Sequence, residues 1–338
     1  MNEAQEFLGA LRRNGHVRDP HAQLVPLSGG VSSEIYVVHD GTQKFVVKRA
    51  LAKLKVKDNW FANVERNVSE RDYIEYVGKM TPGAVPRIYF SCPDEGYFGM
   101  EFLDDSFINW KTLLLEGVFC VRHAELAGAL LGEIHCRTTG NDFLRNSFDT
   151  TANFHQLRVE PYLITTGSRH PTLQAIFAAE AQRIEETREA LVHGDFSPKN
   201  ILIHDDRIVL LDCEVAWYGD PSFDVAFLLN HLFLKALYHA PAAAESKNMV
   251  GAFWSTYEQK TPEESATQIT ARLVPLLLML LLARVDGKSP VEYLDAPKQE
   301  FIRSFVYEYL SSPPQSISEL CDIWFKEISR ISFNEVNL

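Results

Sequence analysis

The octapeptide HGDFSPKN at residues 193–200 constrains this chain more than any other stretch of its sequence. It places a carboxylate, Asp195, and an amide, Asn200, five positions apart on a turn-prone loop that leads into the apolar segment 201–203. A second carboxylate, Asp212, follows the next apolar segment. Carboxylate and amide oxygens are ligands that Mg²⁺ takes beside substrate phosphates. The sequence therefore predicts a magnesium–nucleotide site at the ends of two short strands.

Composition and charge narrow the classes of function. The 338 residues are enough for one large domain or two smaller ones, and the hydrophobic share of 46% is ordinary for a globular protein. The formal net charge of −12 makes the surface repel nucleic-acid phosphates, so we expect no nucleic-acid partner. The same charge is compatible with a cationic small-molecule substrate but does not select one.

Cysteine usage and hydropathy indicate the compartment. The five cysteines lie far apart without a CxxC pair, which argues against a disulfide framework or a zinc site and fits a reducing compartment. The first 16 residues lack the apolar core of a signal peptide. The most apolar run, 273–283, has eleven residues, too few to cross a bilayer core of about 30 Å, so a buried helix is expected there. We therefore expect a soluble, cytoplasmic protein without a membrane partner.

The first hundred residues are typical of a small domain with five strands and one helix. A short helix is expected at 3–13, and apolar residues recur at helical spacing through 59–79. The polar segment 104–106 is typical of a linker, so this domain ends near Leu103. The strands are expected in runs of β-branched and aromatic residues between turn signals, at 24–27, 35–38, 44–48, 85–90 and 97–102.

Two features of this domain suit a nucleotide. The Gly/Ser loop at 28–33 leaves backbone N–H groups that can approach phosphates, although a Gly-Gly pair between strands is also an ordinary turn. Lys48 ends an apolar strand, where a buried ammonium group needs a partner. Glu70 or Glu65 on the following helix can supply that partner. The alternatives are a surface lysine and a surface ion pair between Arg66 and Glu70.

The remainder of the chain is predominantly helical in pattern. The stretch 121–137 predicts a helix whose small residues allow close packing, and its His135 is expected to be structural. Residues 140–170 are weakly periodic, and no element is assigned to them. Helices are expected again over 171–190 and from 225 onward. Breaks in the last region are expected at Pro241, Pro262, 286–290 and 313–314.

Phosphoryl transfer needs a phosphate cradle, a metal and a residue that orients the acceptor hydroxyl, and the chain offers candidates for each. Over roughly residues 24–300 it resembles the protein-kinase-like superfamily, specifically the aminoglycoside phosphotransferase and choline kinase branch. The motifs that carry the resemblance are His-Gly-Asp ending at Asp195, Asp-Cys-Glu starting at Asp212, and the run GDPSFDVA at 219–226. Only seven residues separate Asp212 from Asp220, too few for a protein kinase's activation loop. The resemblance therefore implies a small-molecule acceptor.

The resemblance implies a role for each candidate. Asp195 would be the catalytic base, with orientation of the acceptor hydroxyl as its larger task. Asn200 and Asp212 would hold the Mg²⁺ ions that bridge the ATP phosphates. Lys48, held by Glu70, would contact the α- and β-phosphates.

Further residues would complete nucleotide binding. Lys199 would reach the transferred phosphoryl group, with a solvated lysine as the alternative. The Gly/Ser loop would close over the phosphates with Ser28, Gly29, Gly30, Ser32 and Ser33. The hinge, whose backbone would contact adenine, would consist of Met100, Glu101, Phe102 and Leu103.

Four residues are candidates for the acceptor site. Glu214 can help to place the substrate or act behind the metal ligands. Arg284 and Asp286 end the apolar helix and can line a pocket, although they also fit ordinary helix capping. Trp217 can supply an aromatic wall for a sugar or quaternary amine, although core packing is the favoured alternative. Asp224 is expected to cap or anchor the helix that follows it.

The sequence thus predicts an α+β chain with a two-lobed protein-kinase-like fold, in which an N-terminal five-stranded antiparallel sheet with one helix precedes a mainly helical C-terminal lobe. Residues 1–103 would bind the nucleotide, and residues 104–338 would carry the catalytic and acceptor-binding groups. The expected reaction moves the γ-phosphoryl group of ATP, with Mg²⁺, to a hydroxyl of an aminoglycoside, amino alcohol, sugar or related metabolite. The alternative is a nucleotide-binding pseudokinase that acts as a regulator or scaffold. A monomer and a homodimer are both compatible with the sequence.

Overall fold

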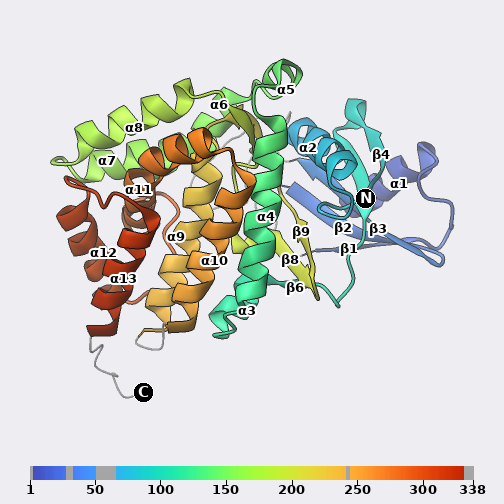
Figure 1. The fold of residues 1–338 in the computed structure, drawn as a ribbon. Coiled ribbons are helices and arrows are strands. Elements are labelled where there is room, and N and C mark those ends of the chain that lie inside the picture. Colours follow the sequence, from blue (N-terminus) through green and yellow to red (C-terminus); the bar gives the residue numbers. More distant parts are fainter. Residues whose placement is uncertain (1–2, 28–32, 51–65, 241–243, 331–338) are drawn as a thin grey trace. The chain divides into compact units, whose positions relative to one another are not determined.

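The computed structural model describes residues 3–27, 33–50, 66–240 and 244–330. The chain divides into two compact units, Met1–Phe107 and Ile108–Leu338 (Figure 1). The sequence placed the boundary after Leu103, at the start of the polar segment that ends the first unit. Each unit has its own buried core, so each is described by itself.

The first unit contains the antiparallel five-stranded sheet that the sequence predicts, in the order β1-β2-β3-β5-β4. Two helices accompany the sheet, α1 (Glu3–Arg13) and α2 (Arg66–Met80). The predicted start of the second helix, 59–65, lies outside the described residues. The strands are β1 (Gln23–Pro26), β2 (Ser33–Asp40), β3 (Gln43–Ala50), β4 (Ile88–Cys92) and β5 (Tyr97–Glu101).

Apolar side chains from α1 and from the sheet form one core in this unit. Phe7 and Leu11 of α1 are buried together with Val38, Phe45 and Val47 of the central strands. These side chains remove apolar surface from water, which is the main favourable term in folding. The strand β3, which carries Lys48, pairs with β2 along one edge and with β5 along the other.

The second unit is mainly helical, as predicted (Figure 1). Two small antiparallel ladders interrupt the helices, one of β7 (Ala190–Val192) with β10 (Trp217–Gly219), and one of β6 (Ile108–Asn109), β8 (Ile201–His204) and β9 (Arg207–Leu210). The longer helices are α4 (Val121–Thr138), α8 (Gln174–Glu186), α9 (Ser222–Tyr238), α10 (Ala244–Lys260), α11 (Glu263–Asp286), α12 (Ala296–Tyr309) and α13 (Ile317–Arg330).

The predicted helix breaks are confirmed where the structure describes them, at Pro262, 286–290 and 313–314, while Pro241 lies outside the described residues. The helix expected over 171–190 is shorter, because Pro171 and Thr172 form a turn before it and its end gives way to β7.

The segment 140–170, which the sequence pattern left unassigned, is almost entirely helical. It consists of α5 (Asp142–Ser147), α6 (Thr151–Phe154), the π-helical segment η2 (His155–Ile164) and α7 (Thr165–Arg169). A π-helix has a wider turn than an α-helix, and such segments are frequent at functional sites. An apolar period of 3.6 residues does not continue through it, which explains why the sequence pattern was weak.

Helix α11 contains the apolar run 273–283 and is buried, as the sequence predicts. Among the residues that the structure describes, it is the one helix long and apolar enough to span a bilayer. However, 67% of its most apolar window is buried inside the fold. That burial is typical of the core helix of a globular unit.

Small residues on α4 allow α10 to approach it closely. A Cβ atom at Gly128 would lie 2.3 Å from the carbonyl oxygen of Phe253, and one at Gly132 would lie 2.9 Å from that of Tyr257. Any larger residue would push the two helices apart. This close packing places His135, one turn further along α4, against Tyr257 of α10.

Candidate active site

A buried ion pair connects the central strand and the helix of the first unit. The Nζ atom of Lys48 lies 2.7 Å from Oε2 of Glu70, and both side chains are 2% exposed. Lys48 stands on β3 opposite Ile35 and Phe98, and Glu70 lies on α2. The pairing is the first of the two that the sequence offered. Removing one member would leave a buried charge without its partner, which costs about 3–5 kcal/mol.

In the second unit, α9 holds the loop that contains the His-Gly-Asp motif. The backbone N–H of His193 donates to Oδ2 of Asp224 at 2.7 Å, and the N–H of Gly194 donates to Oδ1 at 2.9 Å. Asp224 lies in the first turn of α9 and is fully buried. The sequence predicts that it caps or anchors the helix that follows, and these contacts connect the start of α9 to the backbone on which Asp195 stands.

The glycine of this motif is required by the backbone. Gly194 has a φ of +76°, and a Cβ atom there would lie 2.5 Å from the carbonyl oxygen of Val215. Left-handed φ values are strained for residues with a Cβ, and the close contact adds a steric penalty. The loop therefore approaches the segment after Asp212 as closely as backbone atoms allow.

Asp195 is buried between two cations. Its Oδ2 atom lies 3.0 Å from Nη2 of Arg158 and 3.0 Å from Nζ of Lys199. Burial raises the pKa of Asp195, but Lys199 and then Arg158 outweigh it, so that the net pKa lies below the usual value. The carboxylate consequently stays ionised at neutral pH.

Arg158 is the site residue that the sequence analysis missed. It lies in the π-helical segment η2, where its guanidinium also donates to the carbonyl oxygens of Gly194 and Leu157. Although burial opposes its charge, Asp195 and other nearby groups raise the pKa of Arg158 above the usual value. The sequence does show an arginine between two apolar residues, Leu157 and Val159. Because the segment around it is only weakly periodic, the pattern did not indicate that this arginine is buried.

The β8–β9 hairpin brings Asn200 and Asp212 to the same end of its ladder. Ile201 pairs with Leu210, and the carbonyl oxygen of Asn200 accepts the N–H of Leu211 at 2.9 Å. The side-chain Nδ2 of Asn200 donates to the backbone oxygen of Asp195 at 3.0 Å, which fixes the orientation of the amide. Asp212 has a φ of +61°, an uncommon conformation for a residue other than glycine and one that clusters at functional sites.

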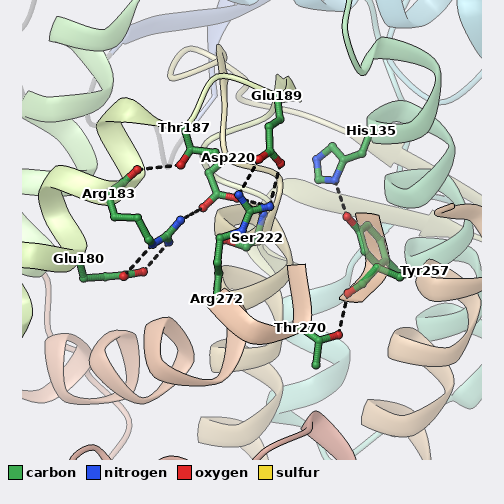
Figure 2. Close-up of polar contacts among 11 residues, drawn as sticks. His135, Glu180, Arg183, Thr187, Glu189, Asp220, Ser222, Tyr257, Thr270 and Arg272 are labelled. Atoms are coloured by element: carbon green, nitrogen blue, oxygen red, sulfur yellow. Dashed lines mark hydrogen bonds and ion pairs between the residues drawn. The ribbon is translucent and has the colours of Figure 1, made fainter. Parts of the chain in front are cut away.

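An ionic network around the buried carboxylate of Asp220 supports the loop that precedes α9 (Figure 2). The carboxylate of Asp220 lies 2.5 Å from Nη1 of Arg183 and 3.6 Å from Nη2 of Arg272. Arg272 also forms a two-point ion pair with Glu189, at 2.7 and 2.8 Å. These contacts indicate a structural role for Asp220.

His135 occupies a structural position as well (Figure 2). Its Nδ1 atom lies 3.0 Å from the hydroxyl of Tyr257, and its Nε2 atom lies 3.4 Å from Oδ2 of Asp224. The ring thus packs against Asp224. In the described part of the chain it forms no hydrogen bond with the carboxylate of Asp195.

The candidate acceptor residues occupy different settings. Trp217 is fully buried with its ring stacked on Phe154 at 4.1 Å, which favours core packing, and we do not retain it as an acceptor wall. Asp286 pairs with Arg303 at 2.8 Å and with His170 at 3.0 Å, an arrangement that joins α11 to α12 and α7. We therefore regard Asp286 as a structural residue.

The two other acceptor candidates are buried but polar. Glu214 is 9% exposed, and its backbone oxygen accepts Nδ2 of Asn153 at 2.9 Å. Arg284 is also 9% exposed, and its Nη1 donates to the hydroxyls of Tyr162 and Ser289 at 3.2 and 2.8 Å.

The remaining nucleotide candidates lie in the first unit. Of the residues predicted to form the hinge, Met100 and Glu101 lie in β5, and Phe102 and Leu103 follow the strand and are partly buried. Ser33 opens β2 and is buried. The other loop candidates, Ser28, Gly29, Gly30 and Ser32, lie outside the described residues.

Comparison with known proteins gives consistent relatives. A methylthioribose kinase of Citrobacter koseri is 23% identical over 298 residues, which are 76% of this chain and 74% of that protein. One of Yersinia pseudotuberculosis is 23% identical over 287 residues, 73% of this chain and 70% of that protein.

Solved structures show the fold. An amicoumacin kinase in complex with AMP-PNP, Ca²⁺ and Ami superposes with a TM-score of 0.60 at 15% identity, covering 96% of this chain and all of that one. A choline kinase of Cryptosporidium parvum gives a TM-score of 0.53 at 14% identity, covering 97% and 99%. The predicted protein-kinase-like fold is thereby confirmed.

A family model decides the assignment, because it matches more than half of the chain. The model described as the phosphotransferase enzyme family covers residues 23–252, which include Lys48, Asp195, Asn200 and Asp212. The predicted resemblance to the aminoglycoside phosphotransferase and choline kinase branch is confirmed by this match and by the named relatives. The chain belongs to the phosphotransferase enzyme family.

Proposed function

We propose that this enzyme transfers the γ-phosphoryl group of ATP to a hydroxyl of a small molecule, with Asp195 as the residue that receives the hydroxyl. The observation that carries the proposal is the fixed position of Asp195. Its loop is anchored by Asp224, and its carboxylate is held by Arg158 and Lys199. Rigid placement of this kind supplies much of the rate enhancement in phosphoryl transfer.

Asp195 orients the acceptor more than it deprotonates it. Its lowered pKa makes it an ionised hydrogen-bond acceptor and a weak base. The acceptor oxygen forms a bond to the γ-phosphorus, the bond from that phosphorus to the bridging oxygen breaks, and ADP leaves. The hydroxyl proton passes to Asp195 late in the reaction and then to solvent. Lys199, close to the same carboxylate, can neutralise charge on the transferred group.

Asn200 and Asp212 fit the requirements of a magnesium site. Because Nδ2 of Asn200 is engaged with the Asp195 carbonyl, Oδ1 is the amide atom that can face a cation, and Asp212 adds a carboxylate. Among the described residues, no group of three or more His, Cys, Asp or Glu side chains could hold a metal alone. Mg²⁺ is usually bound through one or two protein oxygens together with phosphates and water. When bound, it neutralises charge on the phosphates.

Lys48 is proposed to contact the nucleotide phosphates. Glu70 holds its ammonium group in one place within the first unit. We assign the Gly/Ser loop at 28–33 to the same phosphates, and the backbone of Met100–Leu103 to adenine. The support for these assignments is the family membership, since the family model covers both segments.

The cell compartment and assembly are proposals of the same kind. The five cysteines all lie in the described part of the chain, and none of them forms a disulfide. This supports a reducing, cytoplasmic location. We propose an enzyme that acts on a dissolved small molecule as a monomer or homodimer, without nucleic acid or membrane.

An ADP-release screen over hydroxylated metabolites and aminoglycosides tests the proposal. The wild type should release ADP with at least one acceptor class only when Mg²⁺ is present. The Asp212→Asn variant should retain its fold by circular dichroism but lose turnover. Nucleotide binding without ADP release across the whole screen would instead favour the pseudokinase alternative.

A further inference from the structure

Helix α9 buries a lysine for which the described residues provide no ion-pair partner. Lys235 is 1% exposed, and no carboxylate of the described residues lies within 4.0 Å of its Nζ atom. The Nζ atom lies 5.2 Å from the centroid of the Tyr293 ring. Burial, followed by the charges of Lys111 and Arg284, lowers its pKa to about 7. An ammonium group in such a setting is normally stabilised by an anion.

Helix α11 packs against α9 and brings a second buried cation, Arg284, to the same region. Its Nη1 atom has hydroxyl and carbonyl partners at Tyr162 and Ser289, but its Nε atom has no hydrogen-bond partner. Arg284 also forms no ion pair with a carboxylate of the described residues. Two buried cations therefore share one region, and no carboxylate in the described part of the chain forms an ion pair with either of them.

The carboxylates nearby are engaged elsewhere. Glu292 lies 2.6 Å from Lys111, and its side chain is 68% exposed. Asp195 is occupied by Arg158 and Lys199. Neither carboxylate comes within ion-pair distance of Lys235 or Arg284 in the structure.

An unused hydrogen-bonding group lies close to the two cations. His231, one turn before Lys235 on α9, is 8% exposed and its Nδ1 has no partner. Burial, then Lys235 and Arg284, lower the pKa of His231 well below its usual value, so the ring is neutral at pH 7. Such a set of groups can bind the oxygens of an anion.

A chain of ring contacts connects this cluster to the catalytic carboxylate. The ring of His231 lies 5.4 Å from that of Phe227, and the guanidinium of Arg158 lies 5.7 Å above the same Phe227 ring. Arg158 contacts Asp195 directly. His231 of the cluster is thus connected to Asp195 through Phe227 and Arg158.

We infer that the acceptor of this phosphotransferase carries an oxyanion, either a carboxylate or a phosphate ester, which binds Lys235 and Arg284 while a hydroxyl of the same molecule meets Asp195. The inference rests on the proposed function and names its substrate class. The overall negative charge of the chain is compatible with a cationic acceptor. The cluster of Lys235 and Arg284 is locally positive and favours an anionic one.

The inference is tested by comparing acceptors that share a hydroxylated carbon skeleton and carry a negative, neutral or positive group. We would compare glycerate, glyceramide and 3-amino-1,2-propanediol, and likewise gluconate, gluconamide and glucamine, with ribose 5-phosphate and ribose as the phosphate arm. The anionic members should give the larger kcat/KM in ADP release. Turnover of neutral or cationic members at equal kcat/KM would overturn the inference and leave phosphotransfer itself intact.

The Lys235→Met variant tests the assigned residue. It should raise KM for the anionic acceptors about 10- to 100-fold with a smaller change in kcat, and leave the neutral members unaffected. Lys247→Met, which removes an exposed lysine paired with Asp322, is the control. A KM that does not respond to Lys235→Met would contradict the assignment.

Sulfate provides a readout that does not depend on turnover. At constant ionic strength, sulfate should raise the Tm of the wild type more than that of Lys235→Met, and the control variant should behave as wild type. Equal stabilisation of both variants by sulfate would count against the cluster as an anion site. Loss of ADP release from the wild type with every acceptor, despite this selective sulfate effect, would challenge the proposed function and not the anion site.

Discussion

Asp224 accepts the backbone N–H of Gly194 at 2.9 Å, so the first turn of α9 carries the loop on which Asp195 stands. The same carboxylate accepts the N–H of His193 through its other oxygen. Helix α9 also carries Lys235, so one rigid element positions both the reacting carboxylate and the proposed anion site. Functional groups supported by a regular element are held more precisely than groups on loops alone.

Replacing Asp224 with Asn should lower both stability and turnover. An amide retains one acceptor oxygen, so one of the two N–H groups of the loop loses its partner in a buried site. We expect a loss of about 1–3 kcal/mol in the free energy of unfolding, measured by urea denaturation, with a lower kcat. Asp322→Asn, at an exposed ion pair, is the control and should change neither. Wild-type stability in Asp224→Asn would contradict the anchoring role.

Gly194→Ala should be more harmful than its backbone angle alone predicts. Gly140 has a similar φ, +69°, but a Cβ there would meet no atom within 4 Å, whereas one at Gly194 would lie 2.5 Å from Val215. Both variants share the cost of a left-handed alanine, about 1–2 kcal/mol. The difference in unfolding free energy between them isolates the steric contact, and only Gly194→Ala should lose activity. Equal losses in stability would mean that the loop relaxes freely.

Removing Lys199 should move the acid limb of the pH–rate profile to higher pH. Lys199 is the first of the charges that lower the pKa of Asp195, so Lys199→Met lets burial raise that pKa. The active, ionised form is then lost at a higher pH as the solution is acidified. The profile of kcat/KM from about pH 4 to 8 measures the shift separately from any loss of overall rate. An unshifted limb would show that another group controls it.

Stability should depend on pH through Lys235. Its pKa is about 7 in the folded protein, whereas an unfolded lysine has a pKa of about 10.4. Between these values the unfolded chain binds more protons, so the wild type gains stability as pH rises, by at most about 1.4 kcal/mol per pH unit. Lys235→Met lacks this gain. The free energy of unfolding of the wild type minus that of Lys235→Met, measured by urea denaturation, should therefore increase between pH 7 and 10. A difference that stays constant over this range would contradict a buried lysine without an ion-pair partner.

Much of the fold and part of the site could be predicted from the sequence because the signals are local. Alternation and turn residues located the five strands, and the order of Lys48, Glu70, Asp195, Asn200 and Asp212 indicated the family. The pairing of Lys48 with Glu70 follows from a general rule, since a lysine on a buried strand needs a carboxylate nearby.

Other features depend on long-range packing and left no local signal. Arg158 lies in a π-helical segment whose period differs from that of an α-helix, so no pattern marked it as buried. Core packing was the favoured interpretation of Trp217 in the sequence, and its stacking on Phe154 supports that interpretation over a substrate wall. Lys235 is the one lysine in the apolar helix α9, and only the structure reveals that no carboxylate of the described residues lies within 4.0 Å of its Nζ atom.

The most direct test of the account is phosphoryl transfer by the Asp195→Asn variant. Asparagine keeps the shape of the side chain but cannot accept the hydroxyl proton as a carboxylate. We predict that product formation, followed by ³¹P NMR of the phosphorylated acceptor, falls by about 10²- to 10⁴-fold. Binding of Mg-ATP in a thermal-shift titration should remain. Turnover at the wild-type rate in Asp195→Asn would contradict the central claim that this carboxylate receives the acceptor hydroxyl.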